Sequence, residues 1–227
     1  MAAININDLK EHFEFIANKE QAGAYASPEE ISRAAKHAQN EVIRTNYARW
    51  QNSQQATDII GALLQPTTLV IDANGQANYP SDYLHTSSVR YHYTKQIKKG
   101  DVQERDVEVR AYTNAEWGKA LESNIVKPEK RRPGLTFYDT YIQFEPKALG
   151  KVTLDYLRTP PDPLWGYTLV DGREVYAETG GVTGDSVNLL LDENTIEEVV
   201  GSMLSYMGIR IREGSLAQYG EMYKQAT

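Results

Sequence analysis

The sequence predicts an α+β protein in which N- and C-terminal helices pack as a helical bundle and a strand-rich, antiparallel β module is inserted between them. Apolar residues recur at helical spacing over residues 1–65 and again over residues 186–227. Between them, residues 66–185 contain extended runs, many tyrosines and paired turn signals. We therefore expect a helical core of residues 1–65 and 186–227, and a β-rich module of residues 66–185 with proline-bounded arms.

The N-terminal helices are predicted by spacing and by capping residues. Apolar residues over 6–16 follow a helical repeat. Ser27, Pro28 and Glu30 then combine an N-cap serine, a proline at the first helical position and a glutamate at N3. The alanine-rich stripe after this start allows close helix–helix approach, and we expect the helix to reach about residue 51. A third helix is predicted over 57–64, ending before the next proline.

The middle of the chain reads as strands joined by turns and polar connections. A short helix is expected over 114–123. Asn74-Gly75 and Asp171-Gly172 supply the positive φ angles that tight hairpin turns need. Residues 127–134 and 159–166 hold five of the nine prolines and predict ordered loops or arms. The expected strands cover residues 67–71, 89–93, 102–112, 135–144 and 152–158.

The C-terminal region is predicted to be helical. Asp192 or Asn194 can cap a helix whose apolar residues recur at i, i+3, i+4 and i+7 from Ile196, and Gly208 is placed to end it. A further amphipathic segment is expected from Glu213 onward.

The composition excludes several classes of function. The chain has 24 basic and 31 acidic residues, a net charge of −7, so it lacks the basic footprint of a phosphate-backbone binder. It has no cysteine, which removes disulfides, cysteine-ligated metals and thiol nucleophiles and fits a reducing cytoplasm. The first residues carry frequent charges, and no run of about 18 apolar residues occurs. We therefore expect neither a signal peptide nor a membrane span.

The spacing of the polar residues in the sequence does not predict a catalytic site or a metal-binding site. His85 and His92 are separated by an odd number of residues, which places them on opposite faces of a regular strand. Asp192 and Glu193 are best interpreted as caps and dipole partners of the following helix. The glycine-rich residues 180–184 lack the lysine of a phosphate-binding loop. We therefore predict that the protein is not an enzyme, and we expect no metal and no cofactor.

Two features favour large protein–protein contacts instead. Fifteen tyrosines against four phenylalanines indicate half-buried contact surfaces, because tyrosine is enriched where surface becomes interface. The one concentrated basic run contains Lys130, Arg131 and Arg132 between two prolines. A solvated loop, a protein contact and a nucleic-acid contact all stay open for this run. Our candidate interface residues are Lys130, Arg131, Arg132, Tyr219, Met222 and Tyr223.

Three segments resemble phage head–tail adaptor (connector) proteins. The first, YPSDYLHTSSVRY at 79–91, is similar to a signature of proline, small residue, aspartate, aromatic residue and leucine. The second, VTLDYLRTPPDP at 152–163, resembles the element of strand, aromatic residue, leucine, arginine and two prolines in the same proteins. The ending from residue 198 resembles their closing helices. The order of these segments is similar, in particular, to the ring proteins of crAss-like podoviruses that infect Bacteroides.

The resemblance implies a virion structural protein that forms a dodecameric homo-oligomer ring beneath the portal. Such a ring contacts the portal protein, extends the DNA channel and provides a platform for further neck and tail proteins. DNA passes through the lumen during genome ejection without sequence-specific binding, and no membrane is involved. The implied location is the head–tail junction of the virion, after assembly in the bacterial host cytoplasm.

Three other interpretations stay open. One is a phage tail or baseplate structural component of another kind. A second is a carbohydrate-binding module that uses the aromatic residues of the β region. A hydrolase would need a constellation of acids that the spacing does not show.

The motif residues themselves are interpreted as structural turns. Asp82, shortly after Pro80, is expected to accept backbone hydrogen bonds in an Asx-type turn and so to hold the corner at which the next strand begins. Pro160 and Pro161 are expected to keep the exit from the strand that ends near Arg158 extended.

Overall fold

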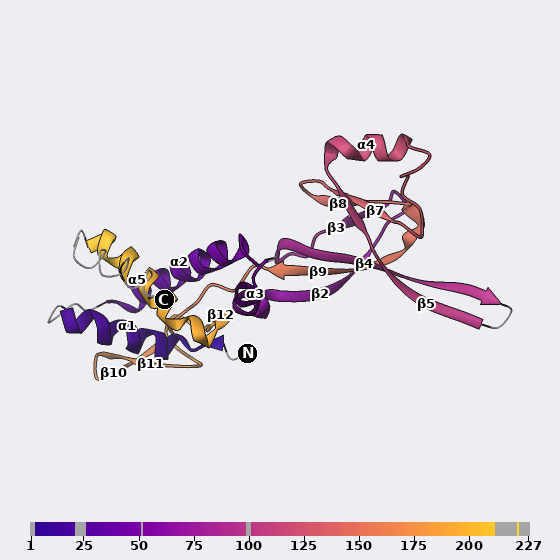
Figure 1. The fold of residues 1–227 in the computed structure, drawn as a ribbon. Helices are drawn as coiled ribbons and strands as arrows, with labels where there is room; N and C mark the ends of the chain where they lie inside the picture. Colours follow the sequence, from indigo (N-terminus) through magenta and orange to yellow (C-terminus); the bar gives the residue numbers. More distant parts are fainter. Residues whose placement is uncertain (1–2, 21–25, 51, 99–100, 212–221, 223–227) are drawn as a thin grey trace. The chain divides into compact units, whose positions relative to one another are not determined.

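The chain divides into two units in the computed structural model (Figure 1). One unit consists of Met1–Leu63 together with Pro160–Thr227, and the other of Leu64–Thr159. By contacts, residues 160–185 therefore group with the terminal helices. The structure describes residues 3–20, 26–50, 52–98, 101–211 and 222.

The expected architecture of a terminal helical bundle with an inserted β module is wrong. The described residues form a mixed α/β protein with five α-helices and twelve strands in four sheets, and the strand-rich part dominates. The unit that holds the terminal helices also contains two small sheets. One pairs β1 (Ala3–Ile4) with β12 (Leu189–Asp192) and the other pairs β10 (Tyr167–Val170) with β11 (Arg173–Tyr176), both antiparallel.

The strands contribute to the core of this first unit, which is why it is not a bundle. Ile4, Leu189 and Leu191 are buried together with the apolar faces of the helices. Strands of two to four residues are too short for an alternating pattern to be recognised in the sequence. The sequence therefore predicts the helices of this unit and misses the strands that pack with them.

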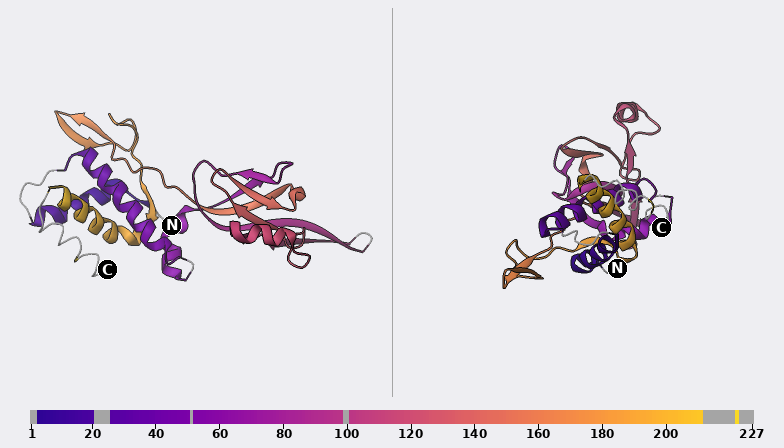
Figure 2. Two further views of the ribbon diagram at one scale, coloured as in Figure 1. Left: turned by 90° about the horizontal axis from the view of Figure 1, so that it is seen from above. Right: turned by 90° about the vertical axis from the view of Figure 1, so that its left-hand side faces the viewer.

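The helices of the first unit begin and end at defined residues. The Ser27 hydroxyl accepts from the Glu30 amide, and the Glu30 carboxylate accepts from the Ser27 amide, so the predicted capping box is confirmed. Figure 2 shows these helices from two further sides. They are α1 (Ile6–Glu20), α2 (Pro28–Tyr47), α3 (Gln54–Ile60) and α5 (Ile196–Ile211).

The alanine stripe of α2 is buried as the sequence predicts. Ala34, Ala35 and Ala38 have no exposed surface, and α2 makes its most extensive helix contact with α5. Small side chains at these positions let the two helix backbones approach closely. On the rim of this contact the rings of His37 and Tyr206 stack with centroids 4.5 Å apart.

Several expected helix boundaries are wrong. Helix α2 ends at Tyr47 rather than near residue 51, and α3 begins earlier than expected because Ser53 caps it. A short 3₁₀ turn, η1 (Gly61–Leu63), follows α3, and Pro66 lies inside a strand. Helix α5 continues through Gly208 to Ile211. The amphipathic segment expected from Glu213 lies outside the described residues, apart from position 222.

The second unit contains two four-stranded sheets and one helix. The first sheet has the order β2-β9-β4-β5 and is antiparallel throughout. The second has the order β3-β8-β7-β6, and its β6–β7 pair is parallel, so the module is not purely antiparallel as expected. The elements are β2 (Leu64–Val70), β3 (Gln76–Asn78), β4 (Tyr83–Lys98), β5 (Asp101–Glu108), β6 (Arg110–Tyr112), α4 (Asn114–Glu122), β7 (Gly134–Phe137), β8 (Tyr141–Glu145) and β9 (Lys151–Arg158). Two further 3₁₀ turns are η2 (Lys147–Leu149), before β9, and η3 (Glu193–Thr195), before α5.

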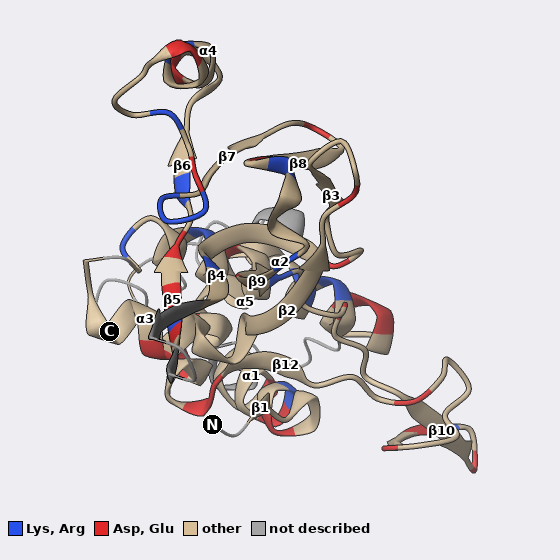
Figure 3. Ribbon diagram, turned by 90° about the vertical axis from the view of Figure 1, so that its right-hand side faces the viewer, with Lys and Arg blue, Asp and Glu red and all other residues tan. Residues whose placement is uncertain are grey.

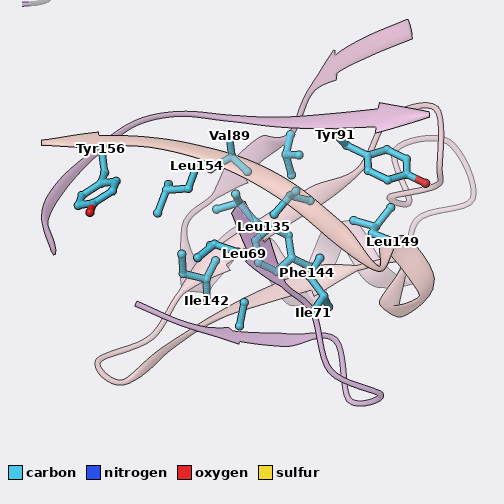
Figure 4. Close-up of a cluster of buried hydrophobic side chains, with 13 residues drawn as sticks. Leu69, Ile71, Val89, Tyr91, Leu135, Ile142, Phe144, Leu149, Leu154 and Tyr156 are labelled. Carbon is cyan, nitrogen blue, oxygen red and sulfur yellow. The ribbon is translucent and has the colours of Figure 1, made fainter. Parts of the chain in front are cut away.

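The core of the second unit lies between these two sheets (Figure 4). Leu154 from β9 and Phe144 from β8 are fully buried in it, so both sheets contribute their inner faces. Tyrosine rings, including Tyr83 and Tyr93, pack around its edge. In this two-layer arrangement, alternate residues are buried along β8 and along most of β9.

The two predicted turn signals have different outcomes. Asp171 and Gly172 both have positive φ angles, and they join β10 to β11 in a two-residue hairpin, as predicted. Gly75 also has a positive φ angle, and its turn is held by the Asp72 carboxylate. However, that turn joins β2 to β3, which belong to different sheets, so no hairpin forms there.

Candidate functional site

The basic run forms an ordered turn, which we call the basic loop (residues 125–133), between α4 and β7. Glu129 and Arg132 exchange main-chain hydrogen bonds of 3.2 and 2.8 Å, which closes the turn. Lys130 and Arg131 occupy the tip of the turn and are exposed. No described residue forms an ion pair with either of these two side chains.

The third predicted interface cation of the loop, Arg132, contacts its own loop. Its guanidinium lies 3.5 Å from the Glu129 carboxylate and 3.4 Å from the main-chain oxygen of Ile125. These contacts hold the two ends of the basic loop together. Lys130 and Arg131 therefore point outward, whereas Arg132 stabilises the turn.

Apolar side chains accompany these cations. Ile125 is 80% exposed and Val126 is 45% exposed, although both are large aliphatic residues. A cavity of about 170 Å³ lies beside the loop, and Val126, Arg132 and Pro133 form part of its wall. The basic loop is therefore a positively charged turn with an apolar flank and a recess next to it.

A second exposed surface lies on the β10–β11 hairpin and the loop that follows it, which we call the acidic arm (residues 167–185). Four carboxylates and one arginine give this arm a charge of −3. Its exposed large apolar side chains are Leu169, Val170, Val175 and Val182. Sequence analysis missed this surface, although apolar residues precede and follow the Asp-Gly turn, and the neighbouring Leu169 and Val170 lie on opposite faces of the hairpin.

The root of the acidic arm is firmly attached. Trp165, which is buried, donates from its indole to Asn7 of α1 and from its amide to the Ser32 hydroxyl of α2. Lys10 lies over the Trp165 ring, 4.8 Å from its centroid. The arm therefore leaves the first unit from a fixed base and exposes its far end.

The two motif segments pair along β4 and β9 in the second unit, and they are also bonded to each other at the corner before β4. The hydroxyl of Tyr156 donates to the carboxylate of Asp82 at 2.8 Å, and the Thr159 amide donates to the main-chain oxygen of Asp82 at 2.6 Å. Pro80 accepts from the Tyr83 amide at 3.1 Å, which forms the turn before β4. Asp82 thus lies at the expected corner, and its carboxylate bonds a distant tyrosine hydroxyl.

The proline pair lies in the first unit, directly after β9. Pro160 is buried, and the main-chain oxygen of Pro161 accepts from the buried amide of Gln39 on α2 at 3.1 Å. Asp162 next to them pairs with Lys36 at 2.6 Å. The extended segment is therefore fastened along α2 at successive residues.

The remaining predicted interface residues are at the C-terminal end of the chain. Met222 is 68% exposed. Tyr219 and Tyr223 lie outside the described residues.

Tyrosines form a partly buried cluster at one edge of the second unit. The rings of Tyr79 and Tyr83 lie 4.5 Å apart, and Tyr83 lies 6.1 Å from Tyr156. The Tyr79 hydroxyl donates to the main-chain oxygen of Tyr138 at 2.9 Å. Burial, together with the nearby Tyr83 and Asp139, raises the pKa of Tyr79 to about 12. Most of these tyrosine rings therefore pack against the core of the second unit and stabilise it.

The two strand histidines lie on β4 in the first sheet of the second unit. The register of β4 against β9 shifts between Thr86 and Ser88, which brings His85 to the same sheet face as His92 and corrects the expectation of opposite faces. His92 instead contacts Asp106 on β5 at 2.8 Å, while burial lowers the pKa of His85. In the described part of the chain, no three histidine, aspartate or glutamate side chains gather as a metal would require.

No helix in the described part of the chain is long and apolar enough to cross a membrane.

Asp192, the first residue of the acidic pair before α5, is the N-cap residue of η3, but its side chain makes no capping hydrogen bond. The main-chain oxygen of Asp192 accepts from the Thr195 hydroxyl at 2.6 Å, and its carboxylate accepts from Asn194 at 3.0 Å. Asp192 and Asn194 line a polar cavity of about 760 Å³ in the first unit.

No family model matches the chain, and no curated protein resembles it significantly.

Proposed function

We propose that the protein is a virion structural protein that forms a head–tail connector ring beneath the portal of a bacteriophage. The observation that supports this most directly is the hydrogen bond from Tyr156 to Asp82. It joins the two sequence segments that resemble connector proteins, although they are far apart along the chain. A shared structural corner explains why both segments would occur together in one family.

The exposed surfaces of the chain suit assembly into a closed ring. A ring of more than two identical subunits needs two different surfaces that meet head to tail. The basic loop and the acidic arm are two such surfaces, opposite in charge and on different units. The net charge of −7 also suits a DNA conduit, because a lumen that bound phosphate tightly would slow the exit of DNA.

Native mass spectrometry tests this proposal. The full chain is measured alone and then mixed with the portal protein encoded by the same genome, with the portal protein of an unrelated phage as the control. We expect a twelvefold species of the chain, free or on its own portal, and none on the unrelated portal. A monomer or dimer that does not bind the portal protein would overturn the connector proposal and favour a tail or baseplate component of another kind.

A further inference from the structure

We propose that the acidic arm (residues 167–185) of one copy docks against the basic loop (residues 125–133) of the next copy. This contact rests on the proposed ring, and it names the two surfaces through which neighbouring subunits would meet. The occupant of the basic loop is thus a second copy of this chain.

Exposed apolar side chains are concentrated in these two segments. Among the described residues, eleven large hydrophobic side chains are exposed, and six of them belong to the acidic arm or the basic loop. Leu169 and Val182 of the arm are 60% and 65% exposed, and Ile125 of the loop is 80% exposed. Clustered apolar surface with a polar rim is typical of protein–protein contact sites.

The charges of the two segments are complementary. The acidic arm carries −3 and the basic loop carries +3, from four cations against Glu129. Figure 3 shows the acidic residues along the β10 hairpin and the basic ones in the loop beside β6. Asp171 and Glu178 of the arm form no ion pair with any described residue, and neither do Lys130 and Arg131 of the loop. Complementary charges of this kind steer association and fix the register of the partners.

The acidic arm ends in a tight turn, and a recess lies beside the basic loop. A two-residue turn makes the tip of the acidic arm narrow, and Val170 lies directly before that turn. The recess of about 170 Å³ beside the basic loop is bounded by Val107, Val126 and Pro133, among others. An aliphatic side chain of the arm would find apolar walls there and cations at the rim.

The exposure of both surfaces points to a partner copy. Val182 in its unit and Ile125 in the other unit each keep most of their surface in solvent. An isolated two-stranded hairpin is marginally stable in water. Docking onto a neighbour would bury both apolar faces of the arm and so stabilise the hairpin.

Cysteine cross-linking tests the contact directly, because the natural chain has no cysteine. Val182→Cys and Ile125→Cys are prepared as separate single variants of the full chain, mixed and treated with a short bismaleimide. We expect a cross-linked dimer of one arm variant with one loop variant, and a ladder of larger multiples from the double variant. Val70→Cys, at a position that is 66% exposed on β2, replaces Ile125→Cys in the matched control and should give several-fold less dimer.

Charge variants provide a second readout. Lys130→Glu with Arg131→Glu should lower the cross-linking yield several-fold, and so should added salt, because exposed charges are screened. Asp171→Asn with Glu178→Lys on the partner variant should restore part of the yield, because the charge of the arm then rises from −3 to 0 and no longer repels the altered loop. Asp171→Asn suits its positive φ angle, which asparagine tolerates.

Three outcomes would overturn the arm–loop contact. They are a cross-link confined to single chains, equal yields for the control pair, and a chain that stays monomeric and unlinked alone and with its portal. The first two are compatible with a twelvefold ring in native mass spectrometry, in which case the connector proposal stands with another interface. Conversely, arm–loop dimers without any portal-bound ring would support self-association and refute the connector.

Discussion

The phenolic hydroxyl of Tyr156 lies 2.8 Å from the carboxylate of Asp82, 74 positions away in the sequence. Tyr156 is buried at the end of β9, and Asp82 directly precedes β4, so the bond fastens the beginning of one strand to the end of its neighbour. Burial, and then the hydrogen bond to Asp82, raises the pKa of Tyr156. The neutral phenol is therefore the form that the folded protein prefers.

Loss of this hydrogen bond is expected to destabilise the second unit. Tyr156→Phe removes the donor and leaves the Asp82 carboxylate without it, at a cost of about 1–3 kcal/mol in the free energy of unfolding. Asp82→Ala should cost a similar amount, and the double variant less than the sum, because both remove one interaction. Urea unfolding followed by tyrosine fluorescence measures this. Strict additivity of the two changes would contradict the coupling, and Tyr138→Phe, at an exposed ring, is the control.

Alkaline pH is expected to destabilise the second unit through Tyr79. The pKa of Tyr79 is about 12 in the folded protein and about 10 in the unfolded chain, so the folded state holds the proton more tightly. This stabilisation is complete below pH 10 and is lost as the pH rises through about 12. The urea midpoint of the natural chain should therefore fall more steeply between pH 10 and about pH 12 than that of Tyr79→Phe. Equal slopes would contradict the assignment.

The α2–α5 contact is expected to tolerate no larger side chain at Ala35. Ala35 has no exposed surface, so Ala35→Leu would overpack the contact and cost about 1–3 kcal/mol. Asn40→Leu, at an exposed position of the same helix, is the matched control and should change stability little. Thermal unfolding followed by circular dichroism at 222 nm compares the two variants with the natural chain. Equal melting temperatures for both variants would show that the helices can separate to make room.

The capping box of α2 is expected to stabilise the first unit. Ser27→Ala removes the side chain that accepts from the Glu30 amide and should cost about 1 kcal/mol of stability. Ser27→Asp should retain most of it, because aspartate is also a good N-cap residue. Ser81→Ala, at an exposed position, serves as the control. A loss equal for Ser27→Ala and Ser27→Asp would contradict the capping role.

Local signals in the sequence predicted the elements that short-range interactions determine. Ser27 with Glu30 marked the start of α2, and Asp171-Gly172 marked the β10–β11 hairpin. In each case the deciding hydrogen bonds or backbone angles lie within a few residues of the signal. The buried alanines of α2 followed in the same way from helical spacing.

Strand pairing depended on partners far away in the chain. The Asn74-Gly75 turn is present, yet β2 pairs with β9 and β3 pairs with β8, so the local signal did not reveal the pairing. Pro66 was expected to follow the end of a helix, but it lies in β2, at the edge of its sheet, where the missing amide of proline is tolerated. The short strands β1 and β12 carry too few residues to show alternation, which is why the helical bundle was expected.

For the candidate surfaces too, some properties follow from the sequence and others depend on the tertiary structure. The sequence by itself determined the positive charge of residues 127–132, the excess of tyrosine and the absence of cysteine, because these are properties of composition. Only the tertiary structure decided that Lys130 and Arg131 lie exposed at the tip of a turn while Arg132 bonds its own loop. It also decided that the apolar residues of the acidic arm remain in solvent and that Asp82 meets Tyr156. Burial and pairing depend on which distant segments lie next to each other. The packing of the whole chain determines these neighbours.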